Sequence, residues 1–296
     1  MVDRLARRRL VGPLAFALLA GIAGCAPGDD SGRLHRQAEE ALARWTNAVA
    51  AAGAPSVFPV GELTRQVGTW EREVGDRYKV ALMSGAIEAP PDSLPDARPP
   101  DGEVRWQDGT SQTVRLHSAP EALGAIRVES AQPCPDCVPL RVSSARLTSA
   151  TAETTRGPAD VPVWEFTIAG PAVLVTRVAL AQQVTLSPPP WDSYDPPVGL
   201  RIDSATASAD GRILSVAFVG SPYPSDQHCG ADYSGEAVES TTAVVVIVNV
   251  RPHFDIGACA AVGARRTAEV TLASPLGDRA VLEVQQGMPV PVVRAR

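Results

Sequence analysis

Two cysteines separated by two residues are the first candidates for chemistry in this chain. The segment Cys134-Pro-Asp-Cys137 has the spacing found in thiol–disulfide oxidoreductases. That chemistry requires a lowered thiolate pKa, which is usually obtained by placing the first cysteine at a helix N-terminus. Here Pro139 and a strand-like run follow the second cysteine. The sequence therefore predicts a structural disulfide at this position, with a redox site as the alternative.

A second group of residues has the chemistry of zinc ligands. It consists of His228, Cys229, His253 and Cys259. The cysteine ligands of zinc fingers are closely spaced in sequence, whereas Cys229 and Cys259 are far apart. In an oxidising compartment a disulfide between Cys229 and Cys259, with two surface histidines, is expected instead of a zinc site. We therefore predict no metal and no cofactor.

Motifs for nucleophilic or phosphate chemistry are absent from the sequence. There is no Gly-x-Ser-x-Gly elbow and no Gly-rich phosphate loop. Lys79 is preceded by Asp76, where a Ser-x-x-Lys motif needs serine. His35 and His117 have no companion motif. No catalytic residue is predicted.

Four aromatic residues could line a ligand surface: Trp164, Trp191, Tyr194 and Tyr233. Aromatic residues in strands usually belong to the core. We expect those in the proline-rich loop, Trp191 and Tyr194, to pack against the edge of a domain.

The N-terminal residues have the layout of an export signal. Arg7, Arg8 and Arg9 precede a short apolar run, and small residues follow it up to Cys25. The run is shorter than the about 20 apolar residues of a membrane span. The segment Ile22-Ala-Gly-Cys25 resembles the lipobox of bacterial lipoproteins, with isoleucine where leucine is most usual. The resemblance implies a signal peptide over residues 1–24 and a lipid on Cys25, which would anchor the protein stably. An ordinary signal peptide is the alternative.

Processing would leave an acidic chain of two-domain size. Residues 1–24 carry four arginines and one aspartate, so their removal changes the net charge from −6 to −9 and leaves 272 residues. An acidic chain has no general attraction to nucleic acid, which we exclude as a partner. The even number of cysteines left after Cys25 predicts disulfides. Three pairings can occur, and proximity favours Cys134 with Cys137 and Cys229 with Cys259.

A tether and an amphipathic helix are expected within residues 25–56, ending at Gly53 and Pro55. The apolar face of this helix consists of Leu34, Ala38, Ala41, Leu42, Trp45 and Val49. The charges on the other face are mixed and lack the basic bias of helices that lie on membranes. We therefore expect the helix to pack on its own domain rather than on a partner or a membrane.

Residues 57–186 are predicted to form an α+β domain. Asp108-Gly109 lies between two strand-like runs and predicts a hairpin. Ser118 is a candidate helix cap, with Pro120 in the first turn. Further strands are expected at Tyr78–Ile87, Leu140–Leu147, Val161–Ile168 and Ala172–Leu180.

The proline-rich segment Ser187–Pro197 cannot continue a sheet ladder, so we place an interdomain linker there. Residues 198–296 contain short strand-like runs without helical periodicity, which favours an immunoglobulin-like β-sandwich. The apolar run Ala243–Val250 is too short to span a bilayer and is expected to be a central strand covered on both faces. The other runs are 200–206, 213–219, 267–272, 280–284 and 290–293. The predicted fold class is mainly β, with an α+β first domain.

Several short segments together are similar to an uncharacterised lipoprotein group of high-GC Gram-positive (actinobacterial) bacteria. These segments are Cys134-Pro-Asp-Cys137-Val-Pro-Leu, Arg156-Gly-Pro-Ala159, Pro162-Val-Trp-Glu-Phe166, Cys229-Gly-Ala-Asp-Tyr233 and Pro275-Leu-Gly-Asp-Arg279. The resemblance implies an extracytoplasmic position on the cell membrane. It implies no activity, substrate or catalytic residue.

The sequence leads to one main functional hypothesis and two alternatives. The main hypothesis is a non-enzymatic, membrane-tethered protein that binds or scaffolds an envelope protein or cell-wall component. The first alternative is an extracytoplasmic enzyme whose site is assembled only by the fold. The second, a solute-binding lipoprotein of a transporter, is weaker because strands and helices do not alternate as a parallel α/β lobe requires.

Overall fold

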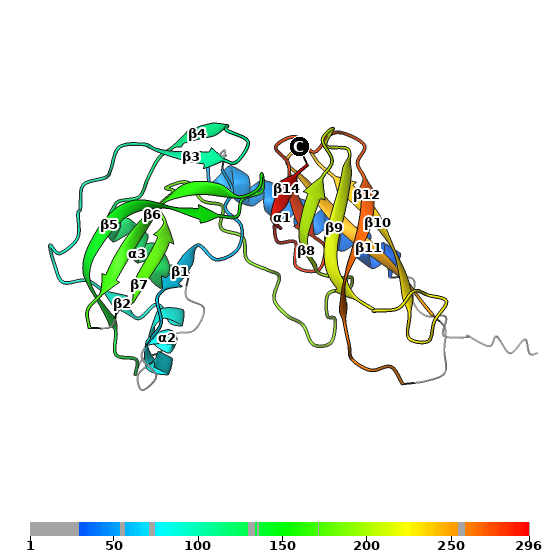
Figure 1. The fold of residues 1–296 in the computed structure, drawn as a ribbon, viewed down its shortest axis with the longest axis horizontal. Helices are drawn as coiled ribbons and strands as arrows, with labels where there is room; N and C mark the ends of the chain where they lie inside the picture. The colour runs from blue at the N-terminus through cyan, green and yellow to red at the C-terminus, as the bar shows by residue number, and fades with distance from the viewer. Residues whose placement is uncertain are drawn as a thin grey trace, which may run out of the picture.

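The chain folds into two β-rich units that lie side by side (Figure 1). The computed structural model describes residues 30–53, 57–70, 75–129, 134, 136–170, 172–253 and 258–295. Strands greatly outnumber helices in the described residues, so the predicted mainly β class is confirmed. Cys25 and the signal segment lie outside the described residues.

The first unit is built on a sheet whose strands run in the order β1-β7-β6-β3-β4, with β5 on the other edge of β6 and β2 beside β5. Its strands are β1 (Thr64–Val67), β2 (Ile87–Glu88), β3 (Gly102–Trp106), β4 (Ser111–Val114), β5 (Leu140–Ala152), β6 (Ala159–Ile168) and β7 (Leu174–Val178). Helix α2 (Gly75–Met83) packs on β5, and α3 (Ala119–Val128) packs on β2 and β7.

The local signals in the first unit predicted its hairpin and its capped helix correctly. Strands β3 and β4 pair antiparallel, and Gly109 in the turn between them has a φ of +85°, which favours glycine. The Ser118 hydroxyl accepts a hydrogen bond from the Glu121 N–H, and the Glu121 carboxylate accepts one from the Ser118 N–H. This reciprocal pair is a capping box.

The predicted strand over Tyr78–Ile87 is wrong. Most of that run forms α2, and a two-residue strand, β2, follows at Ile87–Glu88. Tyr78, Ala81 and Leu82 are spaced three and four residues apart, so a helix brings all of them to the core. A short apolar run cannot distinguish a strand from a buried helix by its pattern alone.

The second unit is a sandwich of two sheets, β10-β11-β13 and β12-β9-β8-β14. Its strands are β8 (Ile202–Ala207), β9 (Ile213–Gly220), β10 (Ala231–Glu239), β11 (Ala243–Pro252), β12 (Ala264–Thr271), β13 (Ala280–Glu283) and β14 (Val292–Arg294). Most pairs are antiparallel, but β11 with β13 and β8 with β14 are parallel. The linker range 187–197 contains neither helix nor strand.

Strand β11 is covered on both faces, as its apolar sequence predicts. Val244, Val246 and Val248 belong to the core between the two sheets. Val245 and Ile247 belong to a separate core under a helix. Because side chains alternate along a strand, every residue from Ala243 to Val248 is buried.

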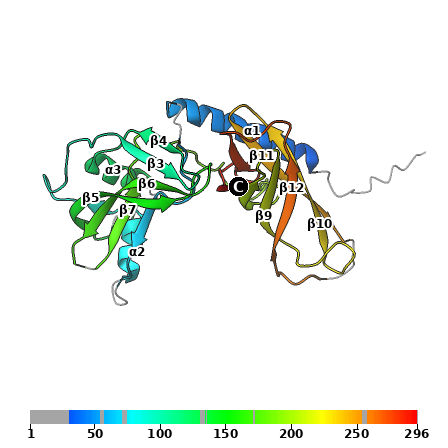
Figure 2. The same ribbon diagram turned by 45° about the horizontal axis from the view of Figure 1, so that its top comes forward.

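That covering helix is α1 (Ser31–Ala51), and it packs mainly on strands β11 and β10 of the sandwich (Figure 2). Its buried residues are Leu34, Ala38, Ala41 and Trp45, all on the predicted face. The two alanines allow the helix axis to lie close to the sheet. The helix therefore closes the second unit although it precedes the first unit in sequence.

Strand β10 was not predicted, because its sequence contains Gly235 and three acidic residues. A Cβ on Gly235 would lie 2.5 Å from the Glu269 carbonyl oxygen of β12. Glycine is needed where the edges of the two sheets approach so closely, and it weakens the strand signal. Strand β1 was missed because it is short and only half buried.

Candidate functional site

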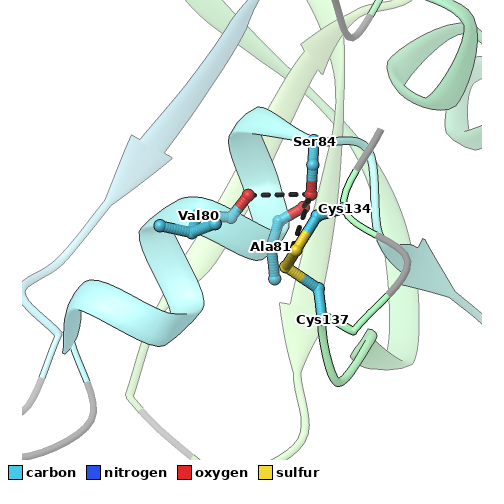
Figure 3. The surroundings of a disulfide bond; sticks show 5 residues. All are labelled: Val80, Ala81, Ser84, Cys134 and Cys137. Carbon is cyan, nitrogen blue, oxygen red and sulfur yellow. Dashed lines mark hydrogen bonds between the residues drawn. A yellow bond between two sulfur atoms is a disulfide. The ribbon is translucent and has the colours of Figure 1, made fainter. Parts of the chain in front are cut away.

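The structure joins Cys134 to Cys137, with Cα atoms 5.4 Å apart (Figure 3). The bridge lies beside Ser84, whose hydroxyl is 3.9 Å from the Cys137 sulfur and donates to the carbonyls of Val80 and Ala81. Ser84 directly follows α2, so the sulfurs lie near the C-terminal end of a helix. The dipole there disfavours a thiolate, whereas thiol oxidoreductases use the opposite end. The surroundings support a structural bridge.

Cys229 is joined to Cys259, the other pair favoured by sequence proximity, with Cα atoms 5.6 Å apart. A ring nitrogen of His228 and the two sulfurs lie within 4.8 Å of one another. Sulfurs bonded to each other are not thiolate ligands, so this group is not a zinc site in the oxidised protein. His253 contacts the Ser225 carbonyl oxygen through Nδ1 at 2.7 Å.

Two histidines without sequence motifs each have a glutamate neighbour. His35 Nε2 lies 2.9 Å from Glu236 Oε1, and His117 Nδ1 lies 3.5 Å from Glu121 Oε2. The second pair is four residues apart, but His117 precedes Ser118, the N-cap of α3, so helical spacing was not a signal for it. The first pair joins α1 to β10, and its two residues are 201 positions apart in sequence. No local pattern predicts a contact over such a separation.

The aromatic candidates divide into two groups. Trp164 is buried in the core and donates through Nε1 to the His117 carbonyl at 2.8 Å, and Tyr233 packs edge-on against Phe218. Trp191 and Tyr194 are 70% and 98% exposed, so the expectation that they pack on a domain edge is wrong. The linker turns them toward solvent instead.

The structure brings together a further site that sequence reasoning missed, a cleft of about 480 Å³ between the two units. We call it the interdomain cleft. The first unit contributes Trp106, Gln107, Asp108, Arg156, Gly157 and Pro158, and the second contributes Ser208–Gly211, Pro275, Gly277 and Val293–Ala295. The volume lies within the range of small-molecule sites. All of its walls are turns or strand ends, which carry little sequence signal.

Trp106 and Arg156 form the first unit's side of the interdomain cleft. The Arg156 guanidinium stacks over the Trp106 ring, 4.1 Å from its centroid. Trp106 Nε1 donates to the Thr154 hydroxyl at 3.0 Å, and that hydroxyl donates to the Gly157 carbonyl at 2.6 Å. The chain of contacts fixes the ring, and the guanidinium stacked on it lines the interdomain cleft.

Charges of both signs line the interdomain cleft. Hydrogen bonds from the Thr110 hydroxyl and N–H, with Arg156 and Arg294 nearby, lower the pKa of Asp108. The Ser208 hydroxyl and the Arg212 N–H lower the pKa of Asp210. Both carboxylates are therefore ionised, and hydrogen bonds within their own turns hold them in place. At neutral pH such groups are better suited to accepting hydrogen bonds than to transferring protons. Arg294 donates to the Gly277 carbonyl.

Several contacts hold the two units and the linker together. A Cβ on Gly157 would lie 3.1 Å from the Val292 carbonyl oxygen, so the β5–β6 turn lies directly against β14. At the C-terminal half of α1, Trp45 packs on Phe58, with ring centroids 5.2 Å apart. Gln37 exchanges two hydrogen bonds with the backbone of Val198 at the end of the linker. Helix α1 thus contacts both units and the linker.

Comparison with known proteins identifies no relative. No protein-family model, no curated protein and no solved structure matches this chain. Among the described residues, no helix is long and apolar enough to cross a membrane.

Proposed function

We propose that this chain is a lipoprotein of the cell envelope, anchored through Cys25 to the extracytoplasmic face of the cell membrane, that binds a polar envelope component in the interdomain cleft. The proposal assigns it a binding or scaffolding role and no catalysis. The observation that carries the binding role is the interdomain cleft itself.

Three features of the interdomain cleft support binding. Its walls come from two units that α1 holds together, so the cavity exists before a ligand arrives. Binding therefore costs little free energy for ordering the protein. The stacked Trp106–Arg156 pair offers a flat surface, and Asp108 and Asp210 offer fixed acceptors. A few placed polar groups on a partly apolar wall are typical of ligand sites.

The charges of the interdomain cleft support a polar ligand without a large net charge. Arg156 and Arg294 are balanced by Asp108 and Asp210. The two carboxylates have lowered pKa values, so neither is tuned as a general acid or base near pH 7. Binding is therefore a better use of these groups than catalysis.

The anchor is supported by the N-terminal sequence. The arginines, the apolar run and the small residues before Cys25 form a complete signal of the lipoprotein type. The two disulfide bonds agree with an oxidising compartment.

Affinity capture from membranes tests the binding role. Ala209 is exposed and lines the interdomain cleft, so the larger side chain of Ala209→Trp should occupy part of the cleft without disturbing either core. We expect this variant to lose the envelope component that the unchanged protein captures. Ala97→Trp, at an exposed loop residue elsewhere in the first unit, is the matched control and should retain it. Equal capture by both variants would contradict binding in the cleft.

A further inference from the structure

The interdomain linker presents two aromatic side chains to solvent. Trp191 and Tyr194 are exposed, and they lie within the proline-rich segment 187–197. The Asp192 carboxylate accepts a hydrogen bond from the Tyr194 N–H at 2.8 Å, which forms a local turn between them. The two rings therefore project from an ordered turn. Neither is needed for the core.

This turn is fixed to the first turns of α1. Arg33 donates to the Asp195 carboxylate at 2.5 Å and to the Pro196 carbonyl at 3.1 Å. A groove between the linker and α1 is lined by both segments, including Arg36 and Pro190. The exposed aromatic residues therefore lie beside the N-terminal part of α1, although about 160 residues separate them in sequence.

The N-terminal part of α1 is also close to the anchor along the chain. Cys25 precedes Asp30, the first residue described before α1, by five residues. A fully extended chain of that length spans at most about 18 Å. A lipid on Cys25 thus keeps the start of α1, and the linker attached to it, within a short distance of the membrane.

We propose that Trp191 and Tyr194 insert into the interfacial region of the membrane that holds the lipid anchor. Tryptophan and tyrosine favour this region because their rings are apolar while their N–H and O–H groups remain hydrated. The contact gives the anchored protein a second attachment and sets the orientation of the interdomain cleft. This inference rests on the proposed lipid anchor.

Tryptophan fluorescence gives a selective test, because the other four tryptophans are at most 6% exposed. The acylated protein is reconstituted into phosphatidylglycerol–phosphatidylcholine vesicles with and without brominated acyl chains. Brominated lipid should quench the emission component that is lost in the Trp191→Phe variant, and acrylamide in the water phase should quench it weakly. Strong acrylamide quenching with no effect of bromine would overturn the inference.

A matched variant tests whether the position matters. In the Trp191→Phe background, Thr113→Trp places an exposed tryptophan on β4, which lies at the upper edge of Figure 1, whereas the linker loops downward between the two units. We expect acrylamide, and not brominated lipid, to quench this tryptophan. Equal bromine quenching at both positions would also overturn the inference, because it indicates nonspecific adsorption. An intact mass without acyl chains would instead overturn the anchor, which separates the two failures.

Discussion

His35 on α1 and Glu236 on β10 form a side-chain pair at 2.9 Å across 201 positions of sequence. The pair lies at the contact between α1 and the β-sandwich. It belongs to the same contact as the buried core of Trp45, Ile247 and Leu282. Helix α1 is therefore an integral part of the second unit, which follows it by about 150 residues in sequence.

The His35–Glu236 pair predicts that docking of α1 weakens as the pH rises. The Ser31 carbonyl and the Glu236 carboxylate raise the pKa of His35, because both favour the protonated ring. The stabilisation is complete below the ordinary histidine pKa of about 6.5 and is lost as the pH rises through the raised value. Over this pH range the amide hydrogens of α1 should exchange faster than the intrinsic pH dependence of exchange alone predicts. The His35→Gln variant should show only the intrinsic pH dependence. Identical pH dependence in both proteins would contradict the role of the pair.

Glu121 predicts a loss of stability in acid. A hydrogen bond from the Ser118 N–H, with further help from Arg98, lowers the pKa of Glu121 to about 2. The contribution is present above the ordinary carboxylate pKa of about 4.3 and is lost as the pH falls toward 2. Glu121→Gln can keep the capping box but not the charge. The unfolding free energies of the two proteins should differ at pH 7 and converge near pH 2. A constant difference would argue against the lowered pKa.

Cleavage of the linker should produce fragments that stay together. The segment 187–197 is largely exposed, so limited proteolysis should cut it before either core. The N-terminal fragment then carries α1, which remains docked on the sandwich of the C-terminal fragment. The two fragments should co-elute in size exclusion and separate in denaturant. Early cleavage within Ala243–Val250, or separation of the fragments in native buffer, would contradict the described arrangement.

Reduction should destabilise the sandwich more than the first unit. The Cys229–Cys259 bridge closes a loop over a sequence separation of 30, worth about 3 to 4 kcal/mol by chain entropy, whereas Cys134–Cys137 spans a separation of 3. The Cys229→Ser/Cys259→Ser double variant should lower the melting temperature of the sandwich, and Cys134→Ser/Cys137→Ser should affect it little. Peptide mapping without reductant and a metal assay check the pairing. Bound zinc with Cys229 and Cys259 both free would show that the bridge is not the native state.

Strong local patterns predicted much of the fold. The apolar face of α1, the Asp108-Gly109 hairpin, the Ser118 cap and the apolar strand β11 all have signals within a few residues. The partner of α1 could not be predicted, because helical periodicity identifies a buried face but not the surface that covers it. Strand β10 could not be predicted for a related reason. Gly235 is needed because β12, a strand distant in sequence, lies directly against it, and this contact leaves no local signal.

The candidate site was less predictable than the fold. Sequence proximity favoured the cysteine pairs that the structure joins. The interdomain cleft left no recognisable pattern in the sequence. Its residues Trp106 and Arg156 belong to the first unit and Asp210 and Arg294 to the second, so they come together only through the contacts that α1 and the β5–β6 turn make between the units. Residues in separate turns show no spacing that distinguishes a binding group from an ordinary turn residue.

The mass of the N-terminal peptide of the protein isolated from membranes tests the lipoprotein assignment most directly. We predict a peptide that begins at Cys25 and carries acyl chains, and a Cys25→Ala variant that is either unprocessed or released from the membrane fraction. An unmodified Cys25, together with an unchanged mass and detergent partitioning of the Cys25→Ala variant, would contradict the assignment.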